Sequence, residues 1–182
     1  MGLAVVHGII SGMKGVIDVQ SEPGEGTTFK ILLPAIKSEE DLSSITEKAL
    51  VRGTERLLVV DDEPMLVDIV RRILQPLGYK LKVSMSPLEA LDVFRSRPQD
   101  FDLVITDLTM PQLTGDKLAR EITKIIPDMP IILCTGFSTP IPEEKARTMG
   151  IQAVLMKPIV MSELTEMVRK VLDGRKGTID KT

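Results

Sequence analysis

Three features that this sequence lacks limit what the protein can be: cysteine pairs, an excess of basic charge, and long apolar runs. The 182 residues include one cysteine, Cys134, so no internal disulfide can form, and its apolar neighbours indicate a buried thiol in a reducing compartment. The formal net charge is -3 and no basic stripe is present, which disfavours direct nucleic-acid binding. The apolar run Leu3–Met13 is broken by glycines and is too short to span a bilayer. We therefore expect a cytoplasmic protein without membrane contact.

The chain contains enough apolar residues, 43% of the total, to form one domain of ordinary size and a fragment of a second. Residues 1–36 predict a short apolar helix and a β-hairpin, whose runs Val16–Ser21 and Thr27–Leu33 flank the turn Glu22–Gly26. A helix and one hairpin are too small to bury a core of their own. We interpret the polar residues 37–55 as a linker and residues 174–182 as a polar tail.

Strands and helices alternate between residues 56 and 173. Most of the expected strands are continuous apolar runs, as a parallel sheet covered on both faces requires. They are Leu57–Val60, Lys80–Ser84, Leu103–Thr106, Ile131–Cys134 and Ala153–Met156. Alternating βα units with short connections predict a three-layer, doubly wound α/β domain with a five-stranded parallel sheet of the flavodoxin-like kind and right-handed crossovers.

Apolar stripes mark the helices between these strands. Gly78 stands at a helix C-terminal position, and Ser86–Glu89 form a capping box with Pro87 at the first helical position. A short fourth helix is expected from near Pro142 to Gly150. The stripes are Met65, Leu66, Ile69, Val70, Ile73, Leu74 and Leu77; Leu88, Leu91 and Phe94; Leu118, Ile122 and Ile125; and Leu164, Val168, Val171 and Leu172.

Polar side chains follow four of the five expected strands. In open parallel sheets, ligand sites lie beyond the carboxyl ends of the strands. Each of these residues alone would be an ordinary strand or turn residue, but at successive strand ends they indicate a site. They are Asp61 and Asp62 after the first strand, Asp107 after the third, Thr135 after the fourth and Lys157 after the fifth.

The carboxylates of Asp61, Asp62 and Asp107, if they lie close together, predict a bound cation. They repel each other by about 1 kcal/mol per pair at 4 Å in water, and by more where solvent is thin. A bound divalent ion removes that cost, and all-oxygen ligation selects a hard ion such as Mg²⁺. Lys157 can pair with Asp107 or with a phosphoryl group placed on it, and the Thr135 hydroxyl can donate a hydrogen bond to that group. Asp107 is thus predicted to act as a nucleophile toward phosphorus and to form an aspartyl phosphate.

Four segments resemble the receiver domain of two-component response regulators, in the order found in that family. They are Val59–Pro64, Asp107–Gly115, Cys134–Phe137 and Met156–Pro158. The resemblance implies a sheet with strand order 2-1-3-4-5 and a conformational switch that is phosphorylated on Asp107 in a phosphorelay and slowly dephosphorylates itself. It implies Mg²⁺, for which Mn²⁺ could substitute.

The same resemblance assigns a role to each site residue. Asp62 would bind the metal directly and Asp61 through water, with Asp107 and the main-chain carbonyl of Thr109 completing the ligands. Thr135 and Lys157 would sense the phosphoryl group. The implied partners are a histidine kinase or a histidine phosphotransfer protein, and a second copy of the chain could bind through the fourth and fifth helices. One departure is Val154, where many members carry Tyr or Phe three residues before the lysine, so a rotating aromatic ring cannot report phosphorylation.

The N-terminal segment resembles a different family. Ser21–Phe29 are similar to the hairpin that ends the ATP-binding domain of sensor histidine kinases, and Gly2-Leu3-Ala4 match the end of its glycine box. This implies the C-terminal fragment of a hybrid sensor histidine kinase, with residues 1–36 as an incomplete ATPase remnant. The kinase catalytic part would lie upstream of Met1, so ATP binding is not predicted and the only catalysis expected is on Asp107 itself. We interpret His7, which lacks an acidic neighbour, as a helix-packing residue.

Two other functions remain open at this point. A haloacid-dehalogenase-like phosphohydrolase also combines an aspartyl nucleophile with Mg²⁺, Thr and Lys, but it places the nucleophile in an Asp-x-Asp pattern after the first strand. Here that position reads Asp61-Asp62-Glu63. The second alternative is an inactive fragment of a truncated hybrid kinase gene.

Overall fold

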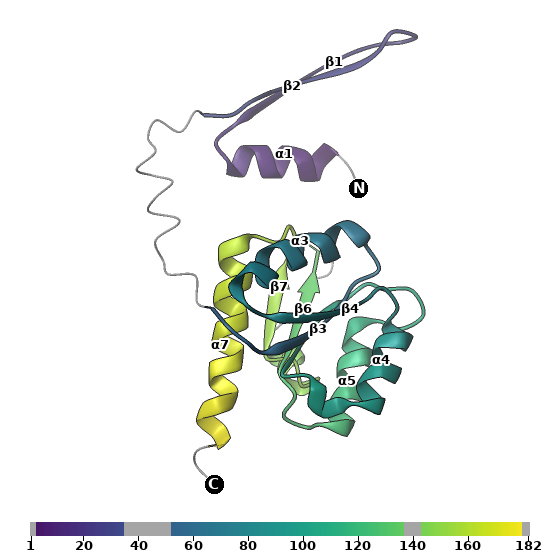
Figure 1. Ribbon diagram of the computed structural model, residues 1–182. Helices are drawn as coiled ribbons and strands as arrows, with labels where there is room; N and C mark the ends of the chain where they lie inside the picture. The colour runs from purple at the N-terminus through teal and green to yellow at the C-terminus, as the bar shows by residue number, and fades with distance from the viewer. Residues whose placement is uncertain (1–2, 35–51, 137–142, 180–182) are drawn as a thin grey trace. The chain divides into compact units, whose positions relative to one another are not determined.

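The structure is a computed structural model that describes residues 3–34, 52–136 and 143–179, and the chain divides into two units. The first unit contains helix α1 (Leu3–Gly12) and the antiparallel strands β1 (Val16–Glu22) and β2 (Gly26–Leu32) (Figure 1). The predicted helix and hairpin are confirmed. Apolar side chains of the hairpin stay exposed, Phe29 by 44% and Ile31 by 49%. This unit therefore has too little material to enclose a core, as the sequence predicts. Most of the predicted linker, up to residue 51, lies outside the described residues.

The second unit alternates strands and helices, and its sheet is fully parallel. The strand order is β4-β3-β5-β6-β7, which is 2-1-3-4-5 counted within this unit. The elements are β3 (Arg56–Val60), α3 (Pro64–Leu74), β4 (Lys80–Ser84), α4 (Pro87–Ser96), β5 (Leu103–Asp107), α5 (Gly115–Ile125), β6 (Ile131–Thr135), α6 (Glu143–Thr148), β7 (Ala153–Met156) and α7 (Met161–Ile179), with 3₁₀ turns at Gln75–Leu77 and Pro98–Asp100. The predicted fold class and strand order are confirmed.

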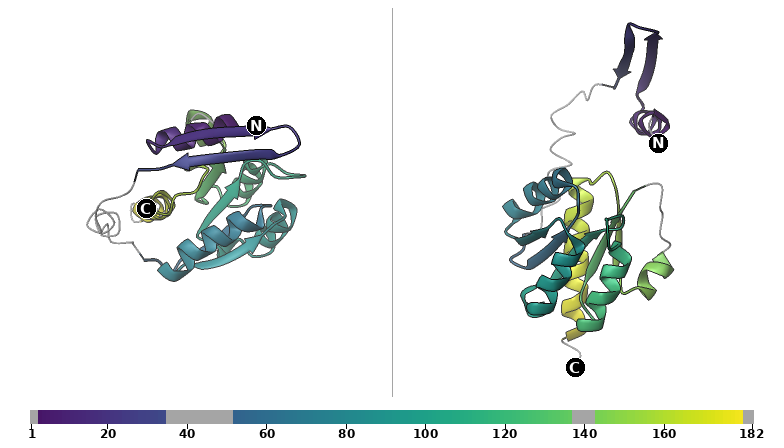
Figure 2. Two further views of the ribbon diagram at one scale, coloured as in Figure 1. Left: turned by 90° about the horizontal axis from the view of Figure 1, so that it is seen from above. Right: turned by 90° about the vertical axis from the view of Figure 1, so that its right-hand side faces the viewer.

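Helices cover both faces of the sheet (Figures 1 and 2), and an apolar core lies under each layer of helices. Helices α3 and α7 cover one face, where Leu57 and Val59 of β3 pack with Leu164 and other residues. Helices α4 and α5 cover the other face, against Leu58 and Val60 of the same strand. Because successive side chains of a strand point to opposite faces, a strand covered on both sides must be apolar at every position. This is why the central strands read as continuous apolar runs.

The stripe predicted for α3 is partly wrong. Met65 is 78% exposed and Ile69 is 38% exposed, whereas Val67, which the prediction omits, is buried with Val70 and Leu74. Val67, Val70 and Leu74 have the i, i+3, i+7 spacing of a single helix face. Met65 and Ile69 are on a neighbouring face that the sheet does not reach. For the same reason Leu88 of α4 and Ile125 of α5, both predicted to be in stripes, are exposed.

The predicted N-cap at Ser86 and the left-handed glycine at position 78 are confirmed, but the reciprocal half of the capping box is not, since the Ser86 N–H donates to Ser84 Oγ at 3.3 Å. Helix α7 also ends later than expected. The Glu89 backbone N–H donates to Ser86 Oγ at 3.4 Å, and Gly78 has the left-handed φ of +99° that favours glycine. Helix α7 continues past Asp173 to Ile179, into the residues predicted to form a polar tail. Residues 174–179 contain one large apolar residue, Ile179, so no apolar stripe in the sequence marked this end of the helix. None of the helices in the described ranges is long and apolar enough to cross a membrane.

Candidate functional site

The predicted site residues gather at the carboxyl edge of the sheet. Asp61 follows β3, Asp107 ends β5, Thr135 ends β6 and Lys157 follows β7. Asp61, Asp107 and Thr135 are 6%, 5% and 1% exposed, although all three are polar. Asp62 is half-buried beside them in sequence. Buried carboxylates are uncommon unless a charge or hydrogen bonds compensate for lost hydration, so their partners decide what this site can do.

Lys157 supplies the compensating charge. Its Nζ lies 2.7 Å from Asp107 Oδ1 and 3.1 Å from Asp61 Oδ2, and 3.9 Å from Oε1 of the exposed Glu63. The ammonium therefore bridges two carboxylates that the chain delivers from strands at different sequence positions. Sequence reasoning identified Asp61, Asp107 and Lys157 but missed Glu63, whose position next to the acidic pair was the available signal.

Backbone N–H groups hold the second oxygen of each buried carboxylate. The Thr109 N–H donates to Asp107 Oδ2 at 2.7 Å, and the Glu63 N–H donates to Asp61 Oδ1 at 2.9 Å. Backbone bonds also join the strand ends: the Leu108 N–H donates to the Cys134 carbonyl, and the Lys157 N–H donates to the Thr135 carbonyl, each at 2.8 Å. The site is consequently built on the sheet itself, and its carboxylates have little freedom to turn.

Gly115 allows α5 to begin directly beside the site. A Cβ at this position would overlap the Asp107 main-chain carbonyl and lie 2.9 Å from Leu133 Cδ1. The Gly115 N–H donates to the Leu108 carbonyl at 3.0 Å, which closes the loop after β5. Sequence reasoning did not single out this glycine as a site residue. Its position at the start of an apolar helix, where glycine is a weak helix former, was the signal.

Burial and charge act together on the pKa values of the site. Burial raises the pKa of Asp61, opposed by the Glu63 N–H and by Lys157, and the charge of Asp107 raises it further. Burial lowers the pKa of Lys157, but its hydrogen bonds to Asp107 and Asp61 outweigh that effect, so the net pKa is raised and the ammonium form is favoured. Burial also raises the pKa of the Cys134 thiol to about 12, which agrees with the prediction of an unreactive core cysteine.

The comparisons with known proteins agree with this geometry. Residues 57–169 match the family model of the response regulator receiver domain. The chain belongs to the response regulator receiver family. The match covers the parallel sheet except for Arg56, the first residue of β3, and it includes every predicted site residue.

Several relatives of known identity are sensor kinases. The chain is 33% identical over 189 residues to the sensor kinase CckA of Brucella abortus and 32% identical over 177 residues to the aerobic respiration control sensor protein ArcB of Escherichia coli. Each alignment includes 95% of this chain but only 19% and 22% of the relative. The chain thus spans about a fifth of the length of these relatives.

Solved receiver domains share the fold. A response regulator receiver domain protein from Clostridium thermocellum is 30% identical with a TM-score of 0.63, and the match covers 67% of this chain and 97% of that one. The receiver domain of the hybrid histidine kinase CckA is 26% identical with a TM-score of 0.54, covering 64% of this chain and 98% of that one. The receiver domain is a phosphorelay signalling module, and receiver domains interact with histidine kinases or phosphotransfer proteins. A haloacid-dehalogenase-like hydrolase is not favoured.

The charge balance of the receiver site suits a hard cation. Asp61, Asp62 and Asp107 bring three negative charges against the single ammonium of Lys157, and the pKa of Asp61 is already raised. All of the side-chain atoms predicted to bind the metal are carboxylate oxygens, the ligands that Mg²⁺ prefers. Within the described ranges, however, no three His, Cys, Asp or Glu side chains are grouped to hold a metal ion. The complete set of predicted carboxylate ligands is therefore not assembled, although its two buried members are adjacent to the same ammonium.

Proposed function

We propose that Asp107 accepts a phosphoryl group from a histidine kinase or a histidine phosphotransfer protein. The observation that carries this proposal is the bridge from Lys157 Nζ to Asp107 and Asp61, because it places a compact cation beside a buried carboxylate at a strand end. An Asp107 carboxylate oxygen attacks phosphorus, an O–P bond forms and the N–P bond to the donor histidine breaks. The imidazole nitrogen keeps the electron pair and takes a proton from solvent.

A bound Mg²⁺, or Mn²⁺ in its place, would neutralise the charge that gathers on the phosphoryl oxygens. Asp62 and Asp107 would hold it directly, Asp61 through water, and the Thr109 carbonyl as the main-chain ligand. Receiver domains generally depend on Mg²⁺ for phosphorylation, which supports this assignment. Asp107 Oδ2 stays oriented by the Thr109 N–H during the transfer.

Lys157 and Thr135 would sense the phosphoryl group. After transfer, the ammonium of Lys157 pairs with the phosphoryl oxygens, and the Thr135 hydroxyl donates a hydrogen bond to them. Slow attack of water on phosphorus then returns the free carboxylate. The half-buried Val154, at the position where many receiver domains carry Tyr or Phe, packs against the core under α5 and has no ring to rotate. The signal would leave through small shifts of β6, β7 and their flanking helices.

We further propose that the parent protein is a hybrid histidine kinase. The alignments with two sensor kinases include 95% of this chain, well beyond the receiver match, and so support residues 1–36 as the end of an ATPase domain and 37–55 as a linker. The phosphodonor would be the parent kinase or a phosphotransfer protein in the cytoplasm. Dimerisation through the fourth and fifth helices of the receiver domain, α6 and α7, belongs to the same proposal.

Incubation with acetyl phosphate and Mg²⁺ tests the assignment of Asp107. The wild-type chain should gain one acid-labile phosphate, visible by intact-protein mass spectrometry, and Asp107→Asn should gain none. Asp92→Asn is the matched control, because Asp92 is an exposed acidic residue on α4. Acid-labile phosphate that survives Asp107→Asn would overturn the assignment. An inert wild-type chain would support the inactive fragment, and rapid turnover of a small phosphate ester would support the hydrolase.

A further inference from the structure

Strand β4 forms the outer edge of the sheet, and a groove follows it. Two cavities, of about 630 and 670 Å³, lie along this strand and share Lys82 and Val93 in their linings. One lies toward Lys80 at the beginning of β4, and the other toward the exposed Met85 just after its end. The floor is largely apolar, with Leu81 and Val83 from the strand. This groove lies at the opposite edge of the sheet from β7, and its end near Pro64 and Met85 reaches the carboxyl edge.

In β4 two residues turn their N–H and carbonyl groups toward the groove, and these are called the outward peptide groups below. In a parallel ladder, alternate residues bond to the neighbouring strand and the residues between them face away. The Lys80 N–H donates to the Glu55 carbonyl at 2.9 Å, and the Ser84 carbonyl accepts from the Asp61 N–H at 3.3 Å. The even-numbered residues therefore bond to β3. Leu81 and Val83 turn their N–H and carbonyl groups outward, and within the described residues β4 pairs with β3 alone.

Along β4, basic side chains on one face of the sheet alternate with apolar side chains on the other. Leu81 and Val83 pack against the core under α3 and α7. Lys80 and Lys82 lie on the other side of the strand, line the groove with residues of α4 and are exposed. Among the described residues neither lysine forms an ion pair, and neither does Arg97 beside them in the groove. The carboxylate of Asp100, also in the lining, is paired with Arg56 at 3.5 Å. In a chain with net charge -3, this edge thus carries unneutralised positive charge.

We propose that the β4 edge binds an extended acidic segment of a protein partner as an added strand. The outward peptide groups of Leu81 and Val83 would pair with the backbone of the segment. Residues of the segment on the α4 side would be Asp or Glu facing Lys80 and Lys82, and the residues between them would be apolar and cover Leu81 and Val83. Addition of a strand to an open edge is an established mode of peptide recognition, in which the backbone supplies affinity and alternate side chains supply specificity.

The lysines select the partner. Lysine on an edge strand opposes pairing with neutral or basic strands, which protects against aggregation. It does not oppose an acidic strand, since opposite charges directly across two strands stabilise the pair. A small anion would leave the outward peptide groups and the apolar floor unused, so the elongated groove favours a peptide.

Peptide binding to the full 182-residue chain tests the proposal by fluorescence anisotropy. The probe is a labelled nine-residue peptide that alternates Glu with Val, and the comparison peptide has the same composition with all Glu residues together. The alternating peptide should bind, and Lys80→Glu combined with Lys82→Glu should weaken binding by about tenfold or more. The matched control combines Lys117→Glu with Arg120→Glu on the exposed side of α5, which makes the same change in charge and should leave affinity unchanged.

Amide hydrogen exchange distinguishes an added strand from simple charge attraction. On peptide binding, exchange at the Leu81 and Val83 N–H groups should slow, while the Lys80 and Lys82 N–H groups, already bonded to β3, should change little. Unprotected Leu81 and Val83 amides overturn the proposal. Equal binding of the clustered-Glu peptide or displacement by inorganic triphosphate also does so, because either would show that charge alone is recognised. Concentration-dependent dimerisation that protects the same two amides would assign the edge to a second copy of the chain instead.

Discussion

Lys157 and Asp107 form the shortest ion pair at the carboxyl edge of the sheet, with 2.7 Å between Nζ and Oδ1. Both side chains are largely buried, at 17% and 7% exposure, and the same ammonium also contacts Asp61. The pair joins the end of β5 to the loop after β7, two strands that are separated in the sheet by β6. A change in charge on Asp107 therefore acts directly on the loop after β7.

Lys157→Met tests this charge balance. The variant keeps most of the side-chain volume but leaves Asp61 and Asp107 buried without a counter-charge, so the free energy of unfolding should fall by about 3 kcal/mol. Mg²⁺ should raise the stability of the variant more than that of the wild type, because a cation replaces the lost ammonium. Urea denaturation with and without Mg²⁺ measures both effects, with the exposed Lys117→Met as the control. The absence of any Mg²⁺ effect in both proteins would contradict a cation site here, and an equal effect in both would contradict replacement of the ammonium by the cation.

Gly115→Ala should damage both stability and the site. The added methyl group would overlap the Asp107 main-chain carbonyl and press on Leu133, so α5 must move away from β5. We expect a loss of about 3 kcal/mol in the free energy of unfolding. Phosphorylation by acetyl phosphate should also slow in the fraction that remains folded. Gly136→Ala is the control, since a Cβ at Gly136 would meet nothing within 4 Å, and normal stability of Gly115→Ala would show that the close approach is not required.

The ion pair between Glu55 and Arg169 joins the segment before β3 to α7. Arg169 Nη2 lies 3.0 Å from Glu55 Oε1, and the two side chains are only 12% and 13% exposed. Arg169→Ala should cost about 3 kcal/mol, because it removes the cation beside a largely buried carboxylate, for which the hydrogen bond from the Thr54 N–H at 2.9 Å does not supply a counter-charge. Arg72→Ala removes a pair with Asp68 whose members are 79% and 46% exposed, so its cost should be about 0.5 kcal/mol or less. Urea denaturation compares the two variants, and equal costs would show that Glu55–Arg169 behaves as a surface pair.

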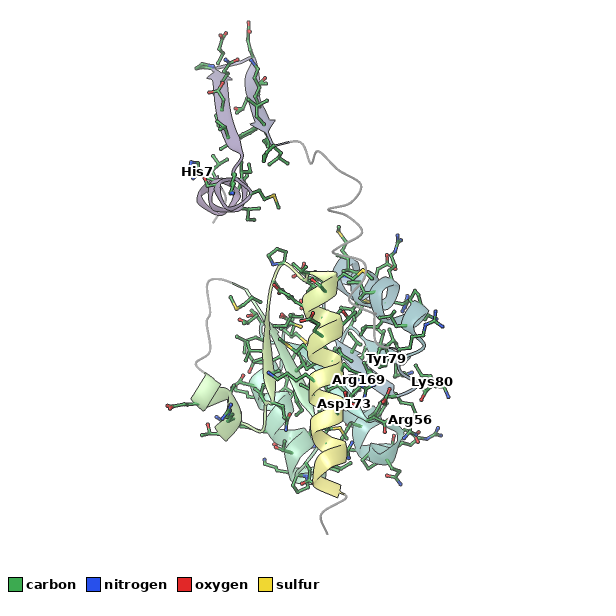
Figure 3. All side chains as sticks on the ribbon, turned by 90° about the vertical axis from the view of Figure 1, so that its left-hand side faces the viewer. His7, Arg56, Tyr79, Lys80, Arg169 and Asp173 are labelled. Carbon is green, nitrogen blue, oxygen red and sulfur yellow. The ribbon has the colours of Figure 1, made fainter. Side chains whose placement is uncertain are left out.

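Tyr79 sits beside this ion pair (Figure 3), with its ring against Gly53. Its hydroxyl is buried and lacks a hydrogen bond of good geometry within the described residues, so Tyr79→Phe should change the free energy of unfolding by about 0.5 kcal/mol or less. Tyr79→Ala should cost about 3 kcal/mol or more, because it leaves a cavity. Comparing the two variants separates the contribution of the ring to stability from that of the hydroxyl. A large loss of stability in Tyr79→Phe would show that the hydroxyl has a hydrogen-bond partner.

The pH dependence of the same variant gives a further measurement. Burial raises the pKa of Tyr79, because it disfavours the phenolate. The folded state then holds its proton more tightly than the unfolded state. The contribution to stability is complete below the unfolded pKa, about 10, and is lost as the pH rises through the higher folded pKa. The difference in stability between wild type and Tyr79→Phe should therefore shift against the wild type above about pH 10, and a pH-independent difference would contradict the raised pKa.

Much of the fold was predictable from periodicity alone. Apolar runs identify four of the five parallel strands, because a strand covered on both faces can carry few polar side chains, whereas the edge strand β4 alternates lysine with apolar residues. Ser86 and Gly78 mark helix ends through local hydrogen bonding and backbone conformation. The helix faces were less predictable. Met65 and Ile69 are as apolar as buried residues, and their exposure follows only from how α3 lies on the sheet.

In the candidate site, too, some features were predictable from the sequence and others required the structure. The order of residues along the chain was enough to predict which groups stand at the strand ends, since Asp61, Asp107, Thr135 and Lys157 each follow an apolar run. Three features required the folded structure: the ammonium that bridges Asp61 and Asp107, the need for glycine at position 115, and the open edge lined by Lys80 and Lys82. Strand periodicity is a local property of the chain, whereas these contacts depend on the order of strands in the sheet and on the angles at which helices cover it.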